Sequence, residues 1–148
     1  YPYVKQIKGN VIDFGSGAGF PGLVLAIMGH KKVNLVESDQ KKCTFLREIA
    51  MLCDIDVTIY NERIENMEFI DVDLIVSRAL APLSKLVDYV ELFVRKSPTK
   101  KIKLPKMLFL KGKSYKDEIS DLYKYKKLYF QEYPSLTDNY GKILYFNG

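Results

Sequence analysis

An apolar run that ends abruptly in glycines constrains the fold of this 148-residue chain more than any other feature. Residues 10–14 read NVIDF, and Gly15, Gly17 and Gly19 follow directly, with Pro21 close behind. The run is typical of a buried strand, and proline favours the first turn of a helix. Glycine has no side chain, so it permits positive φ angles and brings backbone N–H groups close to a ligand. The pattern predicts a strand, a ligand-binding loop and a helix.

Strand and helix patterns alternate along most of the remaining chain. Further strands are predicted at 32–37, 56–60, 72–76 and 106–110, and helices at 21–28, after Asp39, at 82–93 and at 115–123. Asp39 is the expected N-cap of its helix. The helix at 82–93 carries an apolar stripe at helical spacing, made of Leu83, Leu86, Val87, Val90 and Phe93. Such alternation demands a parallel sheet with helices on both faces. Two last strands, at 127–133 and 142–146, have no helix between them and can pair only as a hairpin. We therefore expect one α/β domain over residues 1–148, with a Rossmann-like, seven-stranded, mostly parallel sheet and a C-terminal antiparallel hairpin.

Composition fits a globular domain, since 47% of the residues are hydrophobic and 28% are charged. No apolar run approaches the ~20 residues that cross a bilayer, and the first residues lack the apolar segment of a signal peptide. Cys43 and Cys53 stand in one predicted helix, roughly 15 Å apart along its axis, which is too far for a disulfide. We expect both to be buried core thiols, with no metal site, in a reducing cytoplasm.

Positive charge is concentrated in the last third of the chain. Residues 1–95 hold 11 Lys and Arg against 13 Asp and Glu, whereas residues 96–148 hold 12 Lys against 5 Asp and Glu. A polyanionic partner explains this pattern, and a coding bias toward lysine explains it equally well. The tyrosines at 123, 125, 129 and 133 have the residue type for stacking on bases, but their spacing favours packing in the core and hairpin.

Two kinds of ligand use a glycine loop at this position, a dinucleotide and S-adenosylmethionine. Asp13 lies two residues before Gly15, where its carboxylate favours a cationic ligand and repels a pyrophosphate. Phe20 and Pro21 would crowd a phosphate. Glu37 ends the second strand, and an acidic residue at this position hydrogen-bonds ribose hydroxyls in both ligand classes. With the closing hairpin, these residues favour a methyltransferase; a dehydrogenase and a turn that binds nothing are the alternatives.

The chain resembles the bacterial glucose-inhibited division protein B (RsmG/GidB) family of 16S ribosomal RNA guanine-N7 methyltransferases. The resemblance is carried, in family order, by residues 11–22 (VIDFGSGAGFPG), 35–38 (LVES), 63–65 (RIE), 77–79 (SRA) and 110–112 (LKG). The segments GFPG and SRA are fairly specific to that family. Family members carry a helical segment of several dozen residues before the glycine strand, and about nine residues precede it here. We therefore expect a methyltransferase domain that lacks this segment.

The residues and the resemblance together imply a cofactor site and an RNA-facing rim. The expected cofactor-binding residues are Asp13, Gly15, Ser16, Gly17, Gly19, Phe20, Glu37, Ser38, Ile64, Glu65 and Arg78. Of these, Glu37 would hold the ribose, and Ile64 and Glu65 would border the adenine. The expected RNA-binding residues are Arg63, Lys111, Lys113 and Lys142, the last standing where relatives often have Arg. Lysine cannot make the forked phosphate contact of arginine.

The resemblance also implies a reaction and its participants. S-adenosyl-L-methionine would be the cofactor, a guanine in the 530 loop the methyl acceptor, and the small ribosomal subunit the partner. We expect a cytoplasmic monomer that contacts no membrane. Guanine N7 carries a free lone pair and no proton, so methylation needs alignment and no general base. The sequence shows no base-like cluster, and the single histidine, His30, suits a capping or solvated role at a helix end.

Several alternatives stay open from the residues. Arg78 is expected to orient the guanine, and its alternative is a structural ion pair with Asp13 or Glu65. For Lys111 and Lys113 the alternative is an ordinary solvated strand end. For the whole chain, one alternative is a methyltransferase that acts on another substrate. The other is a non-catalytic relative that binds RNA or an adenosine ligand.

Overall fold

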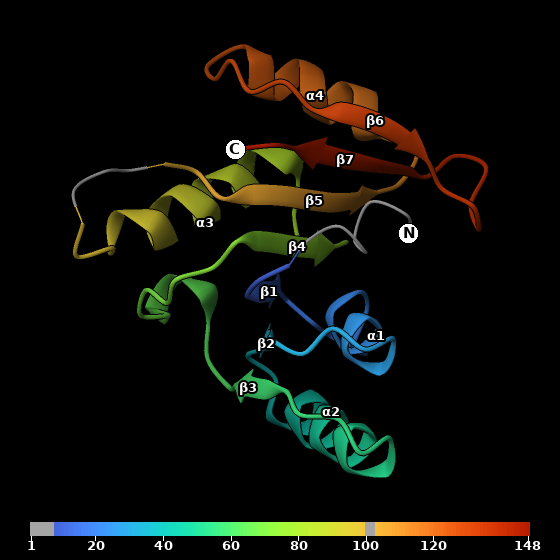
Figure 1. Ribbon diagram of the computed structural model, residues 1–148. Coiled ribbons are helices and arrows are strands. Elements are labelled where there is room, and N and C mark those ends of the chain that lie inside the picture. Colours follow the sequence, from blue (N-terminus) through green and yellow to red (C-terminus); the bar gives the residue numbers. More distant parts are fainter. Residues whose placement is uncertain (1–7, 100–102) are drawn as a thin grey trace.

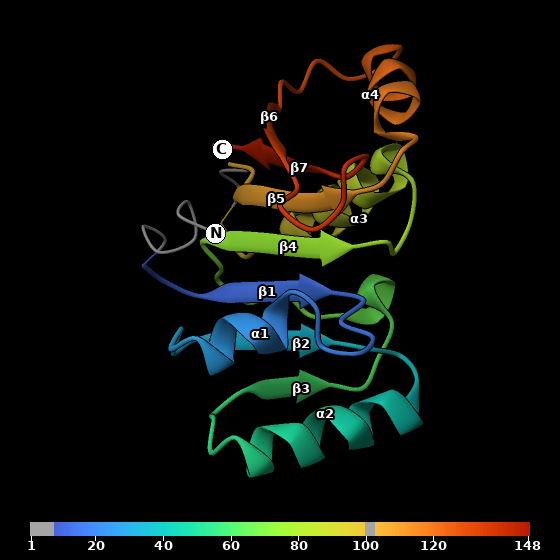
Figure 2. The same cartoon turned by 90° about the vertical axis from the view of Figure 1, so that its right-hand side faces the viewer.

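The computed structural model describes residues 8–99 and 103–148, which form one twisted sheet with helices on both faces (Figures 1 and 2). The strands are β1 (Val11–Phe14), β2 (Val33–Val36), β3 (Thr58–Tyr60), β4 (Leu74–Arg78), β5 (Lys106–Lys111), β6 (Gln131–Pro134) and β7 (Lys142–Phe146). The helices are α1 (Gly22–Ile27), α2 (Gln40–Leu52), α3 (Leu83–Arg95), α4 (Tyr115–Tyr123) and the 3₁₀ helix η2 (Ile64–Asn66). Within the described residues, every helix is too short or too polar to span a membrane.

The order of the strands confirms the predicted architecture. The seven-stranded sheet has the order β3-β2-β1-β4-β5-β7-β6. β1 to β5 are parallel, and β7 pairs antiparallel with both β5 and β6. The chain leaves β1 for α1 on one face of the sheet, and it leaves β4 for α3 on the other face. The carboxyl ends of these two neighbouring strands therefore border a crevice.

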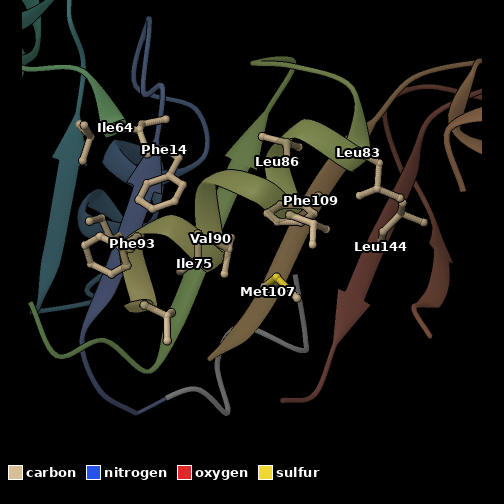
Figure 3. Close-up of a cluster of buried hydrophobic side chains, with 14 of the residues drawn as sticks. Phe14, Ile64, Ile75, Leu83, Leu86, Val90, Phe93, Met107, Phe109 and Leu144 are labelled. Atoms are coloured by element: carbon tan, nitrogen blue, oxygen red, sulfur yellow. The ribbon is translucent and has the colours of Figure 1, made fainter. Parts of the chain in front are cut away.

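The main core lies between the sheet and α3. The apolar stripe predicted for this helix is buried as expected, at Leu83, Leu86, Val87, Val90 and Phe93. Figure 3 shows four of them, Leu83, Leu86, Val90 and Phe93, facing residues of four different strands: Phe14, Ile75, Phe109 and Leu144. α1 and α2 cover the other face over β1, β2 and β3 (Figure 1). Both faces of the central strands are therefore buried, which accounts for their continuous apolar sequences.

The start of α2 follows from its capping residue. The Asp39 side chain accepts hydrogen bonds from the backbone N–H groups of Lys41 and Lys42, as predicted for an N-cap. Cys43 is buried and Cys53 is exposed, and both are free thiols. The expectation that both are core thiols is therefore wrong for Cys53, because α2 ends one residue before it and its side chain leaves the buried stripe.

Two predicted strands differ more from the structure in their bounds than the others do. The segment expected at 72–76 forms β4 at Leu74–Arg78, because the Asp73 side chain accepts from the Asn10 amide and belongs to the turn before the strand. The strand expected at 127–133 is shorter, and β6 begins at Gln131. Leu128 and Phe130 pack against the core but form no strand, so their apolar character reflects burial and not pairing in the sheet.

The tyrosines of the C-terminal third are mostly on the surface. Tyr123, Tyr125 and Tyr129 are exposed, although the rings of Tyr123 and Tyr129 lie 5.8 Å apart. Tyr133, in β6, is partly buried. The expectation that all four pack in the core and hairpin is therefore wrong for the first three. Tyr123 is the last residue of α4, and Tyr125 and Tyr129 lie on the chain that leads from α4 to β6 at the sheet edge.

Replacing Phe93 with alanine is expected to lower the free energy of unfolding by about 3–5 kcal/mol. Its ring is fully buried, with its centroid 5.6 Å from that of Phe14 and 5.3 Å from that of Phe69. The matched control is Leu92→Ala, because Leu92 is exposed on the same helix, and a change within about 0.5 kcal/mol is expected. Urea unfolding measures both; equal losses would show that α3 does not carry the core.

Candidate functional site

A cavity of about 350 Å³ opens at the carboxyl ends of β1, β2 and β4. It is lined by Gly15, Gly17, Val36, Glu37, Ser38, Lys42, Glu62, Arg63, Ile64, Glu65, Arg78, Ala79, Leu80 and Tyr89. Its size is within the range of small-molecule sites, and its place is the crevice where parallel sheets bind nucleotide-like ligands. The structure thus brings together seven of the expected cofactor-binding residues, from four separate segments of the chain.

The glycine loop that forms one wall is fixed by its backbone. Gly15 and Gly17 have φ angles of 71° and 54°, in the left-handed region that favours glycine. The N–H groups of Gly15 and Ser16 both donate to the Val36 carbonyl, each at 3.0 Å. A Cβ atom on Gly15 would lie 2.6 Å from Cδ1 of Leu80. Position 15 therefore requires glycine for both conformation and space.

The Glu37 carboxylate lies on the cavity wall and supports the same loop. One oxygen accepts from the Gly17 N–H at 2.8 Å, and the other accepts from the Asp39 N–H at 2.9 Å. Each carboxylate oxygen has a second lone pair. These free lone pairs suit the hydroxyl groups of a ribose, so the residues present fit the ligand expected from the sequence.

Asp13 lies beneath the glycine loop and not on the cavity wall. It is therefore not placed for the direct contact with the ligand that the sequence suggested. It is fully buried; Oδ2 accepts from the Gly22 N–H at 2.8 Å, and Oδ1 has no hydrogen-bond partner. Burial raises the pKa of this carboxyl from 3.8 to about 7, against the lowering effect of the Gly22 hydrogen bond. A cationic ligand in the neighbouring cavity would favour its ionised form, which also fits S-adenosylmethionine.

Two other predicted loop residues are absent from the cavity wall. Ser16 is buried, and its hydroxyl donates to the Asp13 carbonyl. Gly19 donates its N–H to the Ser16 carbonyl, and a Cβ there would meet Leu23. Their role in the structure is to shape the turn into α1.

The turn after β4 carries the second group of site residues. The Ser77 hydroxyl donates to the Phe14 carbonyl at 2.8 Å and ties β4 to β1. Ala79 follows with a φ of 51°, a strained conformation for a residue with a side chain. Between them, Arg78 makes no ion pair with any described residue, so the alternative of a structural pair with Asp13 or Glu65 is wrong. Its guanidinium lies 5.3 Å from the ring centre of Phe20.

Phe20 lies away from the cavity where it was expected. With Pro21, Val24 and Leu25 it borders an apolar hollow of about 380 Å³ between α1 and the strands β4, β5 and β7. Arg78 is shared by both spaces. Phe20 therefore touches the site through the guanidinium of Arg78.

Lys111 lines a neighbouring cavity at this edge of the sheet, and it is not a solvated strand end because its charge is already paired within the protein. It is only 8% exposed, and its Nζ lies 2.7 Å from Oε2 of Glu118 and 2.8 Å from the Ala81 carbonyl oxygen. Glu118 also accepts from the Leu83 N–H at 2.8 Å. The pair joins β5, α4 and the start of α3, and it fixes the end of the turn that carries Arg78 and Ala79.

The other expected RNA-binding residues lie near the carboxyl ends of the strands. Arg63 lines the first cavity, and Lys142 lines a neighbouring one. Lys113 is exposed, with Nζ 5.5 Å from the ring centre of Tyr140. The His30 ring donates a hydrogen bond from Nε2 to the Gly9 carbonyl oxygen at 2.9 Å.

Sequence reasoning missed several residues of the site. Lys42, Glu62, Leu80 and Tyr89 line the first cavity, and Leu80 directly follows the segment 77–79. Lys96 donates to the carbonyls of Glu65 and Met67, and so holds η2 against the site. Only Leu80, by its position next to the SRA segment, had a recognisable context in the sequence.

Solved structures with little sequence identity share the fold of this chain. It matches a ribosomal protein L11 methylase from Lactobacillus delbrueckii subsp. bulgaricus with a TM-score of 0.71 and 18% identity, covering 99% of this chain and 74% of that one. An rRNA methylase from Streptococcus thermophilus matches with a TM-score of 0.65 and 12% identity, over 95% and 86% of the two chains. The sheet order is that of the class I methyltransferase fold, as predicted.

The chain belongs to the family described as rRNA small subunit methyltransferase G, whose model matches residues 1–138. The protein of that name from Paramagnetospirillum magneticum is 41% identical over 145 residues, 98% of this chain and 67% of the relative. That from Orientia tsutsugamushi strain Ikeda is 42% identical over 134 residues, 90% and 63% respectively. The chain thus spans about two thirds of these relatives, and the family inferred from the sequence is confirmed.

Asp13→Asn is expected to flatten the pH dependence of stability measured without ligand. Because the pKa of Asp13 is raised from 3.8 to about 7 on folding, the folded state holds a proton that the unfolded state lacks between these values. The free energy of unfolding should therefore fall as pH rises through this window, by up to about 4 kcal/mol. Asparagine keeps the acceptor for Gly22 without the charge. Urea unfolding at pH 5 and pH 8 tests this; an equal fall in both proteins would contradict it.

Lys111→Met is expected to cost about 3 kcal/mol of stability, because it leaves the largely buried Glu118 carboxylate without its cation. The double variant Lys111→Met/Glu118→Gln should lose less than the sum of its single variants. Lys124→Met is the control, because Lys124 pairs with Asp121 on the exposed surface and should change stability by less than about 1 kcal/mol. Similar unfolding midpoints for Lys111→Met and Lys124→Met would refute the structural role of the buried pair.

Proposed function

We propose that this chain transfers a methyl group from S-adenosyl-L-methionine to N7 of a guanine in the 530 loop of 16S ribosomal RNA, in the cytoplasm, with the small ribosomal subunit as its partner. The proposal rests on the first cavity, at the carboxyl ends of β1, β2 and β4, in a chain that belongs to this family. Its walls are the glycine loop, Glu37 and the strained turn at Ala79.

The described residues offer a place for each part of the cofactor. Gly15 and Gly17 present backbone to the cavity, Glu37 would hold the ribose hydroxyls, and Ile64 and Glu65 on η2 would border the adenine. When bound, S-adenosylmethionine supplies a methyl group on a sulfonium sulfur; its transfer leaves a neutral thioether and a positively charged guanine, with no proton moved. The protein therefore has to hold two ligands in line, which is catalysis by orientation.

Arg78 is the side chain best placed for orienting the guanine. It borders the first cavity and the one beside it, and it is free of ion pairs within residues 8–99 and 103–148. A guanidinium can donate to O6 of guanine while N7 stays free for the methyl group. The contacts of Arg78 with Phe20 and the tie of Ser77 to Phe14 hold it at the end of β4.

The first test is calorimetric titration with S-adenosylhomocysteine, with NADH as the control ligand. Gly15→Ala should weaken binding at least about tenfold, because the added Cβ is strained at a φ of 71° and would clash with Leu80. Gly112→Ala is the matched control, since no atom lies within 4 Å of its Cβ position. Binding of NADH in place of S-adenosylhomocysteine would favour a dehydrogenase.

The second test is transfer of a tritiated methyl group to 30S subunits from cells that lack this activity. Incorporation at the expected guanine supports the proposal. Binding of S-adenosylhomocysteine without any transfer to subunits or to free 16S rRNA would overturn the substrate and favour a methyltransferase of another substrate, or a non-catalytic relative.

A further inference from the structure

A second cavity, of about 490 Å³, meets the first at the turn after β4. Arg78 and Ala79 line both spaces. The rest of its wall comes from the end of β5 with Gly112, from Lys142 and Ile143 of β7, and from residues 135–138 with Gly141 of the β6–β7 loop. Figure 2 shows that loop beside the carboxyl ends of β4 and β5. A ligand in this cavity therefore lies next to whatever the first cavity holds, with only the Arg78–Ala79 turn between them.

The β6–β7 loop has a defined shape because its polar groups bond to each other. The Ser135 N–H donates to the Gly141 carbonyl, and the Gly141 N–H donates to the Asp138 carbonyl, both at 3.1 Å. The Ser135 hydroxyl accepts from the N–H groups of Thr137 and Asp138. Oδ1 of Asp138 accepts from the Tyr140 N–H at 2.9 Å. The loop therefore holds the Asp138 carboxylate in place before any ligand arrives.

Asp138 is the only acidic residue on the described wall of this cavity, and its second oxygen has unused lone pairs. The cations on the same wall are Arg78, Lys142 and Lys111, and the last is already paired with Glu118. The cavity thus combines one free guanidinium, at the wall shared with the first cavity, with one carboxylate on the loop.

Guanine carries complementary groups on its edges. Its N1–H and 2-amino groups are donors on the Watson–Crick edge, whereas O6 and N7 are acceptors on the other. Adenine has an acceptor at N1 and no 2-amino group, so a carboxylate would face a lone pair. Methyltransferases that extrude a base read it by hydrogen bonds to its Watson–Crick edge.

We propose that the cavity between Arg78 and the β6–β7 loop receives the target guanine, and that Asp138 selects it by accepting hydrogen bonds from N1–H and the 2-amino group. The inference rests on the function proposed above. In this arrangement N7 faces the wall shared with the first cavity, where the methyl group would lie, and Arg78 meets O6.

A carboxylate at this place also assists the reaction. Methylation at N7 makes the purine positively charged, and the charge is spread over the ring that Asp138 contacts. A fixed negative charge near a developing positive charge stabilises the transition state more than the ground state. An amide at position 138 would lack this effect and would also direct an NH₂ group at the donors of guanine.

The test compares Asp138→Asn with Asp121→Asn in methyl transfer to 30S subunits. Asparagine keeps the oxygen that accepts from Tyr140, so the loop should keep its shape. Asp121 is exposed on α4, and among the described residues it pairs only with Lys124. We expect Asp138→Asn to lower kcat/KM by about 30-fold or more, with a fall in kcat, and Asp121→Asn to change it less than twofold. Binding of S-adenosylhomocysteine should be unchanged in both variants.

A second measurement reads base selection without turnover. With the first cavity saturated by S-adenosylhomocysteine, the amide NMR spectrum is followed during titration with GMP, IMP and AMP. GMP should shift the Tyr140 and Gly141 signals most, and IMP less because it lacks the 2-amino group. Asp138→Asn should abolish the preference for GMP over IMP.

The outcomes separate the two proposals. If the wild-type chain methylates no subunit or rRNA, the proposed function fails. If the wild-type chain is active and Asp138→Asn is equally active, only the role of Asp138 is overturned. Equal responses of the loop to GMP and AMP in the wild-type chain would likewise overturn selection by Asp138.

Discussion

The parallel pairing of β1 with both β2 and β4 determines where the central groups of the first cavity lie. It aligns the carboxyl ends of three strands, and it is reinforced just beyond them. The Gly15 and Ser16 amides donate to Val36 at the end of β2, and the Ser77 hydroxyl donates to Phe14 at the end of β1. The glycine loop, Glu37 and Arg78 are therefore positioned by backbone geometry. A substitution that loosened this junction would displace all three together.

Two carboxylates keep the glycine loop in its binding shape without a ligand. Asp13 fixes the loop from below through the Gly22 amide, and Glu37 fixes it from the cavity side through the Gly17 amide. Because these bonds replace the ordering that a ligand would otherwise impose, little conformational entropy is lost on binding. The same arrangement leaves Asp13 buried with one unpartnered oxygen, so without a cation the domain is less stable near neutral pH than at acidic pH. Asp13 thus holds the site ready for a ligand but lowers the stability of the empty domain.

Local patterns in the sequence predicted what local interactions determine. The strand before Gly15, the Asp39 cap and the buried stripe of α3 each depend on neighbours within a few residues, and all are confirmed. Lys111 could not be predicted in the same way. Its burial depends on Glu118, which α4 brings back against the end of β5, and on the carbonyl of Ala81 from a third segment. The exposure of Tyr123 and Tyr129 likewise depends on the edge position of β6, which no spacing encodes.

The structure divides the cations of the chain into those that pair with acidic side chains and those that do not. Lys111, Lys124 and Lys126 pair with Glu118, Asp121 and the acids Asp88 and Glu91 of α3, so part of the basic character serves folding. By contrast Arg63, Arg78, Lys113 and Lys142 make no ion pair with any described residue, and all four follow or border carboxyl ends of the sheet or the cavities there. Unpaired cations attract phosphate, whereas paired ones contribute little. These four cations lie at the edge where both cavities open, so they are available there to the phosphates of the proposed RNA substrate.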